Sequence, residues 1–536
     1  MATRSPKKEP TSSGVIRKKR APKATRTDLS KVVKAVGGHQ VLGITQDLSL
    51  SKYTGDSMLE YGAEVVEQRA IPDFRDGLKP VHRMLIWAAF NMGNNNNKGF
   101  KKSARLVGET LGKFHPHGDA SIYSALVGMA GTKFQGRPEG WATRNISTPL
   151  FEGKGNWGDF VDNAAAPRYT EVRLSKFSDL FMLDPDYLAV MDMVPNYDES
   201  EMVPVILPAK VPVVLLNGFS SIAVGVAGAS PPFALSGVLR LTRKAIRGEA
   251  VTAKDCVKYL IPDYPYGGEC VSDDAEMLEV MKGKGSAVYV PSSTVDQKER
   301  TVTFTSVCPG LMSPRAIQTF LEKLASHKQV ATVDDDTDKK GIRYVIQATR
   351  GVSGVDLTRL AQECIAIGER SERYDIGITI RKSDGGATFK KSNVMEIFAL
   401  WAKWRIEIET KVLNRLIMLQ QKKLERQELL LLAVDNLEII IGALRVKEVT
   451  VEMKIKGELK QVDGAAAFLV RNLKISLEKA TQILQYRLIQ LRAMERTVIL
   501  NTIKAIKLEI KRLQVYLGDP ASRVLENLAE LEKIVL

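Results

Sequence analysis

Arg168 and Tyr169 are the pair of residues in this sequence best suited to nucleophilic chemistry. A phenol is a weak nucleophile at neutral pH, because its unperturbed pKa is about 10, so it needs a neighbour that stabilises the phenolate. The guanidinium of Arg168 can do this, and its planar fork can also hold a phosphate. Three alanines and a proline at 164–167 leave room for a large polyanion to approach the backbone. The structural alternative is a packed tyrosine beside a solvated arginine.

A second group of candidates follows a helical pattern over 53–69. Two prolines and a glycine within 70–80 forbid a continuous helix, so the sequence predicts a shaped loop before the next helix. Lys79, His82 and Arg83 fall close together at that junction. They are suited to phosphate contact, and the alternative is a solvated basic face.

Two histidines flank a proline between two predicted helices. The helices are expected over 103–111 and 120–130, with Asp119 as the N-cap of the second. Helix, turn and helix outline a helix-turn-helix or winged-helix unit. His115 and His117 can act on a proton near neutral pH; they can also form a local hydrogen-bonding device or a metal pair without its other ligands. Basic residues precede them, namely Lys101, Lys102 and Arg105.

Composition favours a polyanionic partner. The chain has 536 residues and a formal net charge of +15, which suits nucleic acid or an anionic membrane surface. Residues 1–31 carry ten Lys and Arg against two acidic residues, so we expect a disordered basic arm that binds phosphate, serves as a nuclear address or is a solubilising tail. No run is long and apolar enough to span a bilayer. The four cysteines are widely spaced, which favours reduced thiols and disfavours a zinc site.

The middle of the chain, about 180–381, alternates short β-like runs, among them 211–216, with helical stretches, so an α+β domain is predicted. Within it, small residues over 217–228 surround Ile222. Close helix packing would explain them, and so would an apolar wedge between base pairs. Asp334, Asp336 and Asp338 alternate as metal ligands can, but an exposed acidic turn is the favoured interpretation because Lys339 and Lys340 follow.

Two helices of about forty residues are predicted over 393–432 and 477–517. With a compact segment between them, they predict an antiparallel coiled-coil hairpin that carries a small helical knob. Each arm would reach about 60 Å at ~1.5 Å per residue. A rod of this kind is a spacer or a dimerisation arm.

Taken together, 69–83, 101–130, 153–174, 217–228 and 334–346 resemble the breakage-reunion (A-type) subunit of type IIA DNA topoisomerases, in colinear order. The resemblance implies that Tyr169 attacks a DNA phosphodiester and becomes linked to the 5′ phosphate, with Arg168 beside it to stabilise the transition state. It further implies that Arg69 and His117 complete the active site and that Ile222 intercalates to bend DNA. The implied DNA-binding residues are Lys79, His82, Arg83, Lys101, Lys102, Arg105 and His115.

The resemblance also implies an architecture. We expect a basic arm (1–50), a winged-helix breakage-reunion domain with the catalytic Tyr (51–180), an α/β tower domain (181–390), and a coiled coil with a helical C-gate for dimerisation (391–536). The expected enzyme is an isomerase that makes staggered double-strand breaks in DNA for ATP-dependent strand passage. No metal site is expected in this chain, because Mg²⁺ and ATP would be held by a separate ATPase and metal-binding subunit that joins a homodimer of this chain.

Three further expectations concern scope. The chain shows no β-pinwheel after the coiled coil, which favours relaxation and decatenation over supercoiling. A cytoplasmic location is expected, that of the host if the origin is phage or another virus, and the basic arm leaves the nucleus as the alternative. The alternative function is a DNA-binding architectural protein of the same fold that has lost cleavage.

Overall fold

The computed structural model describes residues 49–130, 149–158, 162–337, 341–383, 386–447, 449–455, 458–486 and 496–535. The chain divides into two compact units, 1–60 and 61–536. Of the basic arm predicted for 1–50, the structure describes only residues 49 and 50. Asp338 lies outside the described residues. Everything that follows about packing concerns the larger unit.

Three helical segments open the described chain. α1 (Leu50–Val65) runs into a short π-helix (Val66–Ala70), and α2 (Pro80–Asn91) follows after a loop. Pro80 occupies the first position of α2, where its missing N–H costs no hydrogen bond. The loop is pinned by Asp73, whose carboxylate accepts bonds from the backbone of Arg75 and of Arg381. The helix predicted over 53–69 is therefore confirmed, and its last turn is widened.

Two helices and a small sheet surround the Arg168–Tyr169 segment. The helices are α3 (Ser103–Lys113) and α4 (Asp119–Met129), and the sheet has the order β1-β3-β2, with β1 (Lys101–Lys102), β2 (Phe151–Lys154) and β3 (Glu171–Leu174). Both pairings are antiparallel. Val172 and Leu174 alternate with more exposed neighbours on β3 and are fully buried. Apolar alternation thus fixes the strand that follows Tyr169.

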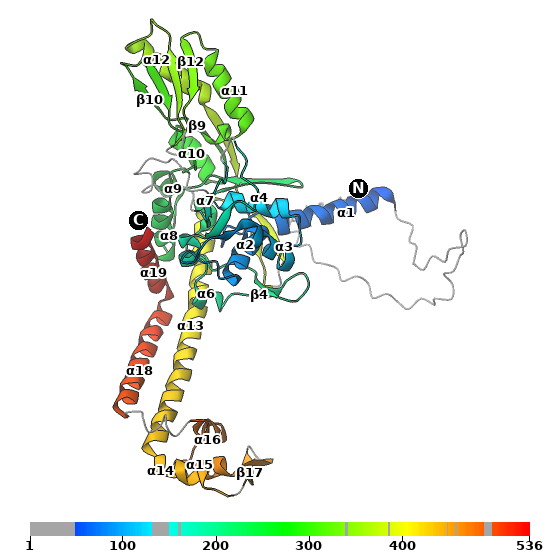
Figure 1. Ribbon diagram of the computed structural model, residues 1–536, viewed down its shortest axis with the longest axis vertical. Helices are drawn as coiled ribbons and strands as arrows, with labels where there is room; N and C mark the ends of the chain where they lie inside the picture. The colour runs from blue at the N-terminus through cyan, green and yellow to red at the C-terminus, as the bar shows by residue number, and fades with distance from the viewer. Residues whose placement is uncertain are drawn as a thin grey trace, which may run out of the picture. The chain divides into compact units, whose positions relative to one another are not determined.

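Two larger sheets, two hairpins and their helices make up most of 175–391 (Figure 1). One sheet has the order β6-β7-β14-β9-β8: β6 (Phe219–Ala223), β7 (Val226–Ser230), β8 (Glu269–Cys270), β9 (Lys284–Val290) and β14 (Arg370–Asp375). Another has the order β10-β11-β13-β12: β10 (Ser293–Asp296), β11 (Thr301–Phe304), β12 (Val330–Asp335) and β13 (Tyr344–Ala348). The hairpins pair β4 (Met193–Pro195) with β5 (Met202–Pro204) and β15 (Gly377–Arg381) with β16 (Ala387–Lys391).

Helices lie between these strands, as the sequence predicts. They are α5 (Lys176–Phe181), α6 (Pro185–Leu188), α7 (Val213–Asn217), α8 (Leu235–Ile246), α9 (Ala253–Tyr259), α10 (Asp274–Met281), α11 (Pro314–Ala325) and α12 (Val355–Gly368), with a 3₁₀ turn at Pro309–Leu311. α11 shows how the local sequence starts a helix. Ser313 caps the first turn by accepting a hydrogen bond from the Ala316 N–H, and Pro314 occupies the first helical position. The mixed α and β character predicted for the chain is confirmed.

The last part of the described chain contains two long helices that lie side by side and antiparallel (Figure 1). α13 (Val394–Asp435) has 42 residues, and α18 (Arg496–Gly518) returns along it before α19 (Pro520–Val535). Ion pairs join the two at Glu428–Lys507 (2.9 Å) and Asp435–Arg496 (2.8 Å). Between them in the chain come α14 (Leu437–Leu444), β17 (Thr450–Ile455), β18 (Glu458–Asp463), α15 (Gly464–Leu473) and α16 (Leu477–Leu484), whose helices share an apolar cluster with the end of α13.

Several sequence predictions about these elements are wrong. The strand expected at 211–216 is replaced by α7, because a continuous apolar run carries no period that separates a buried helix from a strand. The second long helix does not run unbroken from 477: α16 ends at Leu484, and α18 begins at Arg496. The knob is not purely helical, since β17 and β18 form a hairpin. Asp119 is not an N-cap, because the cap position is Gly118.

A buried charge cluster joins α6, α13 and α19. Glu409 is fully buried and accepts from the Tyr187 hydroxyl (2.6 Å), while its other oxygen lies 3.2 Å from Arg523. Arg405, also buried, lies 3.5 Å from Glu409 and stands over the Tyr187 ring at 4.2 Å. Asn527 donates to the Tyr187 hydroxyl (2.9 Å). The Glu409 carboxylate therefore neutralises two arginines, Arg405 of α13 and Arg523 of α19, where these two helices contact each other.

No described helix combines the length and the apolar character that a bilayer crossing requires.

Candidate active site

Tyr169 lies at the end of a loop that presents its side chain to solvent. The backbone turns at 167–169, where the Tyr169 N–H donates to the Ala166 carbonyl (2.8 Å). The side chain is 64% exposed, whereas the next residue, Thr170, is fully buried. The Arg168 guanidinium stands 4.7 Å from the centroid of the Tyr169 ring, within the range of a cation–π contact. The packed-tyrosine alternative is therefore excluded, and the two predicted partners are adjacent in space.

The N-terminus of α3 holds this loop through backbone hydrogen bonds. The Ser103 N–H donates to the Thr170 carbonyl, and the Ala104 N–H donates to the Pro167 carbonyl, each at 3.0 Å. The first N–H groups of a helix have no partner within it, so α3 satisfies them with carbonyls of the loop. One of these hydrogen bonds lies before Tyr169 and the other after it, so together they fix the position of the Tyr169 Cα.

Arg69, His115 and His117 form a second cluster. The rings of His115 and His117 are stacked, with centroids 4.0 Å apart and planes at 15°. Burial, and then the charges of His117 and Arg69, lower the pKa of His115 to about 4, so His115 is neutral at pH 7. His117 and Arg69 are exposed. Among the residues described for this single chain, no hydrogen bond or ion pair links this cluster to Arg168 or Tyr169.

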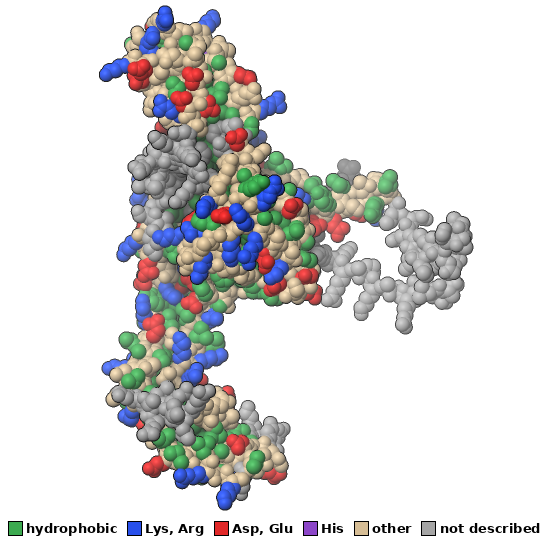
Figure 2. All heavy atoms as spheres, in the orientation of Figure 1, with side chains coloured by type: hydrophobic (Ala, Val, Ile, Leu, Met, Phe, Trp, Pro, Cys, Tyr) green, Lys and Arg blue, Asp and Glu red, His purple; other side chains and the backbone are tan. Residues whose placement is uncertain are grey.

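The basic residues before α3 differ in what they can bind. The Lys101 ammonium makes an internal hydrogen bond, which it donates to the Met92 carbonyl (2.6 Å). Burial, and then the charge of Arg105, lower the pKa of Lys101. Lys102 is exposed, pairs with Glu171 at 3.1 Å, and has its ammonium 3.5 Å from the Tyr169 carbonyl. Arg105 is exposed in the first turn of α3. Figure 2 shows Lys and Arg side chains gathered over the region where α2 and α3 lie.

If Arg105 contacts a DNA phosphate, the Arg105→Ala variant should bind duplex DNA more weakly and with a smaller salt dependence. Loss of one phosphate contact is expected to reduce the slope of log K against log salt by about 0.9. The matched control is Lys298→Ala, which removes an exposed charge in the turn between β10 and β11. Fluorescence anisotropy across a salt series measures both. An unchanged slope for Arg105→Ala would remove this residue from the interface.

Arg83 contradicts its predicted role. It is 1% exposed and holds Asp76 through two bonds of 2.7 and 2.9 Å, with a third to the Leu78 carbonyl (3.1 Å). Asp76 also accepts from the Leu207 N–H (3.0 Å). A guanidinium buried in this way is not available to a phosphate, so the prediction that Arg83 grips the DNA backbone is wrong. Its function is structural: it closes the loop before α2.

The neighbours of Arg83 are only partly accessible. Burial lowers the pKa of Lys79. Burial first, and then the charges of Lys79 and Arg83, lower the pKa of His82 to about 3. His82 is therefore neutral at pH 7 and offers a phosphate at most a neutral N–H. The phosphate-binding role predicted for these two residues has a weaker electrostatic basis than the sequence suggests.

The depressed pKa of His82 predicts that acid destabilises this part of the fold. Above about pH 6.5, the ordinary value, the imidazole is neutral in both states and costs nothing. Below about pH 6.5 the unfolded chain binds a proton that the folded chain does not bind. The free energy of unfolding therefore falls as the pH falls, until the pH reaches the folded pKa of about 3. The expected slope is at most ~1.4 kcal/mol per pH unit. His82→Gln should flatten the pH dependence, between pH 7 and 5, of the opening free energy that hydrogen exchange reports for the α2 amides; an unchanged slope would contradict the assignment.

Ile222 stands on an exposed hairpin rather than in a helix. It pairs with Ala227 across β6 and β7, next to the turn at Val224 and Gly225, and is 86% exposed. Gly225 has φ +72°, which favours glycine. Ala223 and Val226 pack on the buried Val66 and Ala70 of the π-helix that carries Arg69. Two of the small residues in 217–228 thus pack against a helix, as the structural alternative expects, while the hairpin leaves Ile222 exposed.

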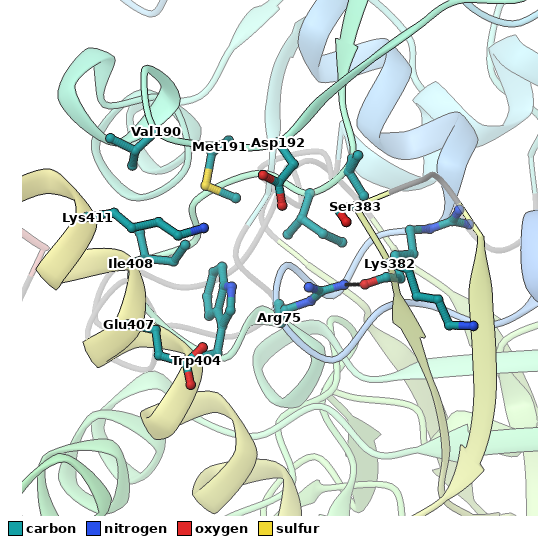
Figure 3. A pocket seen from close by; sticks show the side chains of 13 residues that line it. Arg75, Val190, Met191, Asp192, Lys382, Ser383, Trp404, Glu407, Ile408 and Lys411 are labelled. Atoms are coloured by element: carbon teal, nitrogen blue, oxygen red, sulfur yellow. Dashed lines mark hydrogen bonds between the residues drawn. The ribbon is translucent and has the colours of Figure 1, made fainter. Parts of the chain in front are cut away.

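A cavity of about 170 Å³ lies elsewhere (Figure 3). Figure 3 shows Trp404, Glu407, Ile408 and Lys411 of α13 on one side, and Arg75 and Lys382 on the other. None of the predicted site residues lines it. Arg168, Tyr169 and His117 are instead exposed, so a large substrate can reach them.

Metal ligation finds no support around the acidic turn. Asp334 lies in β12 and is exposed, and Asp336 pairs loosely with Arg343 at 3.7 Å. Within the described ranges, no three His, Cys, Asp or Glu side chains converge so that they could hold a metal ion.

Sequence reasoning missed three hydroxyl residues beside Tyr169. Thr170 and Ser103 are buried, and Tyr123 of α4 reaches the same loop. The available signal was periodicity at single positions: Thr170 continues the inward alternation of Val172 and Leu174, and Ser103 precedes the buried Leu106 and Val107 at helical spacing.

The chain is similar to known proteins over most of its length. Residues 69–529 match the family model for the A subunit of DNA gyrase/topoisomerase IV. The DNA gyrase A subunit of Kosmotoga olearia is 30% identical over 480 residues, which cover 88% of this chain and 56% of that protein. The corresponding gyrase protein of Streptococcus pneumoniae is 31% identical over 464 residues (84% and 52%), and that of Pseudomonas aeruginosa 31% over 510 (88% and 53%). The chain thus spans about half the length of the curated relatives it matches.

Proposed function

The chain belongs to the family formed by the A subunits of DNA gyrase and topoisomerase IV, and from that premise we propose that it is the DNA-cleaving and DNA-resealing subunit of a type IIA topoisomerase. The observation that carries the proposal is Tyr169, an exposed phenol on a firmly held loop with a guanidinium over its ring. A hydroxyl so placed can reach a duplex that lies on the surface.

The proposed reaction exchanges one phosphodiester for another. The phenolic oxygen of Tyr169 forms a bond to phosphorus, the bond from phosphorus to the 3′ oxygen breaks, and the DNA is left linked through its 5′ phosphate. The phenolic proton leaves to a base, and the departing 3′ oxygen takes one up. Because a phosphate ester is made for each one broken, the step is reversible and resealing needs no ATP.

Positive groups near Tyr169 are proposed to stabilise the charge that develops on phosphorus. Arg168 is closest to the ring, and Lys102 stands at the Tyr169 carbonyl. Arg69 and His117 are exposed and are proposed to act on the same phosphate or its proton. His115 is neutral at pH 7 and stacks on His117, so we assign it a supporting position.

The elements support a division into functional parts. We propose that α2, α3, α4 and the sheet β1-β3-β2 form a winged-helix DNA gate within 51–180, and that 181–390 form a tower domain whose β6–β7 hairpin inserts Ile222 between base pairs. We propose that α13 and α18 form a coiled coil, within 391–536, that ends in a dimerisation gate. The exposed side chain of Ile222 and the antiparallel packing of the two helices support these assignments.

A second polypeptide is proposed to complete the enzyme. Two copies of this chain would each supply one Tyr169, and a separate subunit would hold Mg²⁺ and hydrolyse ATP. The metal would screen charge on the scissile phosphate. The described side chains offer it no set of three ligands, so its donors are proposed to come from the partner.

A covalent-trapping assay tests the proposal. The chain is mixed with a gyrase-type or topoisomerase IV-type ATPase subunit, supercoiled plasmid and Mg²⁺, and the reaction is stopped with detergent. Linear DNA with protein on its 5′ ends is expected. DNA that is bound and shifted but never cut would favour the architectural alternative.

A further inference from the structure

The loop that carries Tyr169 is held by a chain of three hydroxyl groups as well as by backbone bonds. The Tyr123 hydroxyl lies 2.6 Å from the Ala165 carbonyl and 2.9 Å from the Thr170 hydroxyl, and its single proton can be donated to one of the two at a time. The Thr170 hydroxyl contacts that of Ser103 at 2.8 Å. A hydroxyl can both donate and accept, so the chain links Ser103 to Thr170, Tyr123 and Ala165.

Burial makes these contacts stronger than surface hydrogen bonds. Thr170 and Ser103 are fully buried, and Tyr123 is half-buried, with its ring 6.2 Å from that of Trp157. A hydroxyl in such a place has no water to replace a lost partner. Removing one member therefore loosens the loop rather than exchanging one solvent contact for another.

The chain brackets the nucleophile on both sides. Ala165 lies four residues before Tyr169 and Thr170 directly after it, so α4 grips the loop through Tyr123 at two points around the exposed phenol. α3 grips it through Ser103, which binds the Thr170 side chain and also its carbonyl. The loop is thereby tied to the two helices that flank the histidine turn.

We propose that Tyr123, Thr170 and Ser103 are positioning residues that set the place and direction of the Tyr169 side chain for attack on phosphorus. Attack demands that the phenolic oxygen approach in line with the leaving oxygen, and an error of about 1 Å costs ~10²-fold in rate. Arg168 and Tyr169 meet DNA; these three hydroxyls do not. The inference rests on the proposed function, because it assigns a role in that reaction.

The test compares three variants by single-turnover cleavage and resealing of a duplex with a defined site. Tyr123→Phe removes the hydroxyl and keeps the ring, Thr170→Val removes a hydroxyl with little change of shape, and Thr170→Ser keeps the hydroxyl without the methyl group. Cleavage by Tyr123→Phe and Thr170→Val is expected to slow by 10- to 100-fold, while the Kd for duplex DNA stays within twofold. Thr170→Ser is expected to cleave within threefold of the parent chain.

Tyr264→Phe is the matched control, because it removes a hydroxyl from a separate internal network, in which Tyr264 contacts Tyr374 at 2.6 Å. Parental cleavage and resealing rates in Tyr123→Phe and Thr170→Val would overturn the inference. So would a loss that Thr170→Ser shares in full, or one matched by Tyr264→Phe, since both indicate general destabilisation. If the parent chain, mixed with the ATPase subunit and Mg²⁺, binds the duplex but never cleaves it, the proposed function fails instead, which separates the two claims.

Discussion

Replacement of Tyr169 with phenylalanine is expected to abolish covalent attachment to DNA. The change removes a single oxygen atom from a side chain that is 64% exposed, so it should cost neither stability nor DNA affinity. Loss of a nucleophile typically lowers turnover by ~10⁴-fold or more. The remaining phenyl ring keeps its contact with Arg168, so the difference isolates the hydroxyl. Detergent-trapped cleavage of supercoiled plasmid measures the effect.

Tyr197→Phe is the matched control for that variant. Tyr197 is also exposed, at 53%, and its hydroxyl donates to the Gly112 carbonyl. Full cleavage is expected from it. Residual cleavage by Tyr169→Phe at the parental rate would show that another group attacks the phosphate, and the proposed mechanism would be wrong.

The second large effect is expected at Glu409. In Glu409→Gln the amide oxygen can still accept from Tyr187, but Arg405 and Arg523 lose the carboxylate that neutralises them. Breaking a buried pair by removing one partner costs about 3–5 kcal/mol. Tyr187, Arg405 and Arg523 belong to α6, α13 and α19. Loss of the carboxylate should therefore weaken the packing of α19 against α13.

Hydrogen exchange is the right measurement for that prediction, since a chain with several cores does not unfold in one step. Amides of α19 and of α13 around Arg405 and Glu409 should exchange faster in Glu409→Gln. Glu407→Gln changes an exposed residue two positions earlier on the same helix and should leave exchange unaltered. Equal protection in the two variants would mean that the cluster adds nothing to the junction.

The sequence predicts best those features that depend on local pattern. The long helix α13 follows from apolar spacing that persists over many turns. The pairing of Tyr169 with Arg168 is predicted from their chemistry and their adjacency in the chain, and the structure places them together at the surface. Such features need no knowledge of distant contacts.

What the sequence could not show depends on partners far along the chain. Arg83 is expected to meet DNA because it is basic, yet Asp76 and the Leu207 backbone close around the same site. Val213–Asn217 folds as a helix although a strand is predicted there, because a short continuous apolar run has no periodicity that distinguishes a buried helix from a buried strand. The hydroxyl chain through Tyr123 and Thr170 spans 47 residues, a separation that no local pattern reports.

The most direct test of the central claim is to identify the amino acid joined to DNA. Trapped complexes are digested with protease and nuclease, and the peptide bearing the residual nucleotide is sequenced by mass spectrometry. The account predicts a peptide that includes Tyr169 and carries a 5′ phosphate on its phenolic oxygen. A nucleotide on any other residue, or a link through a 3′ phosphate, would contradict it.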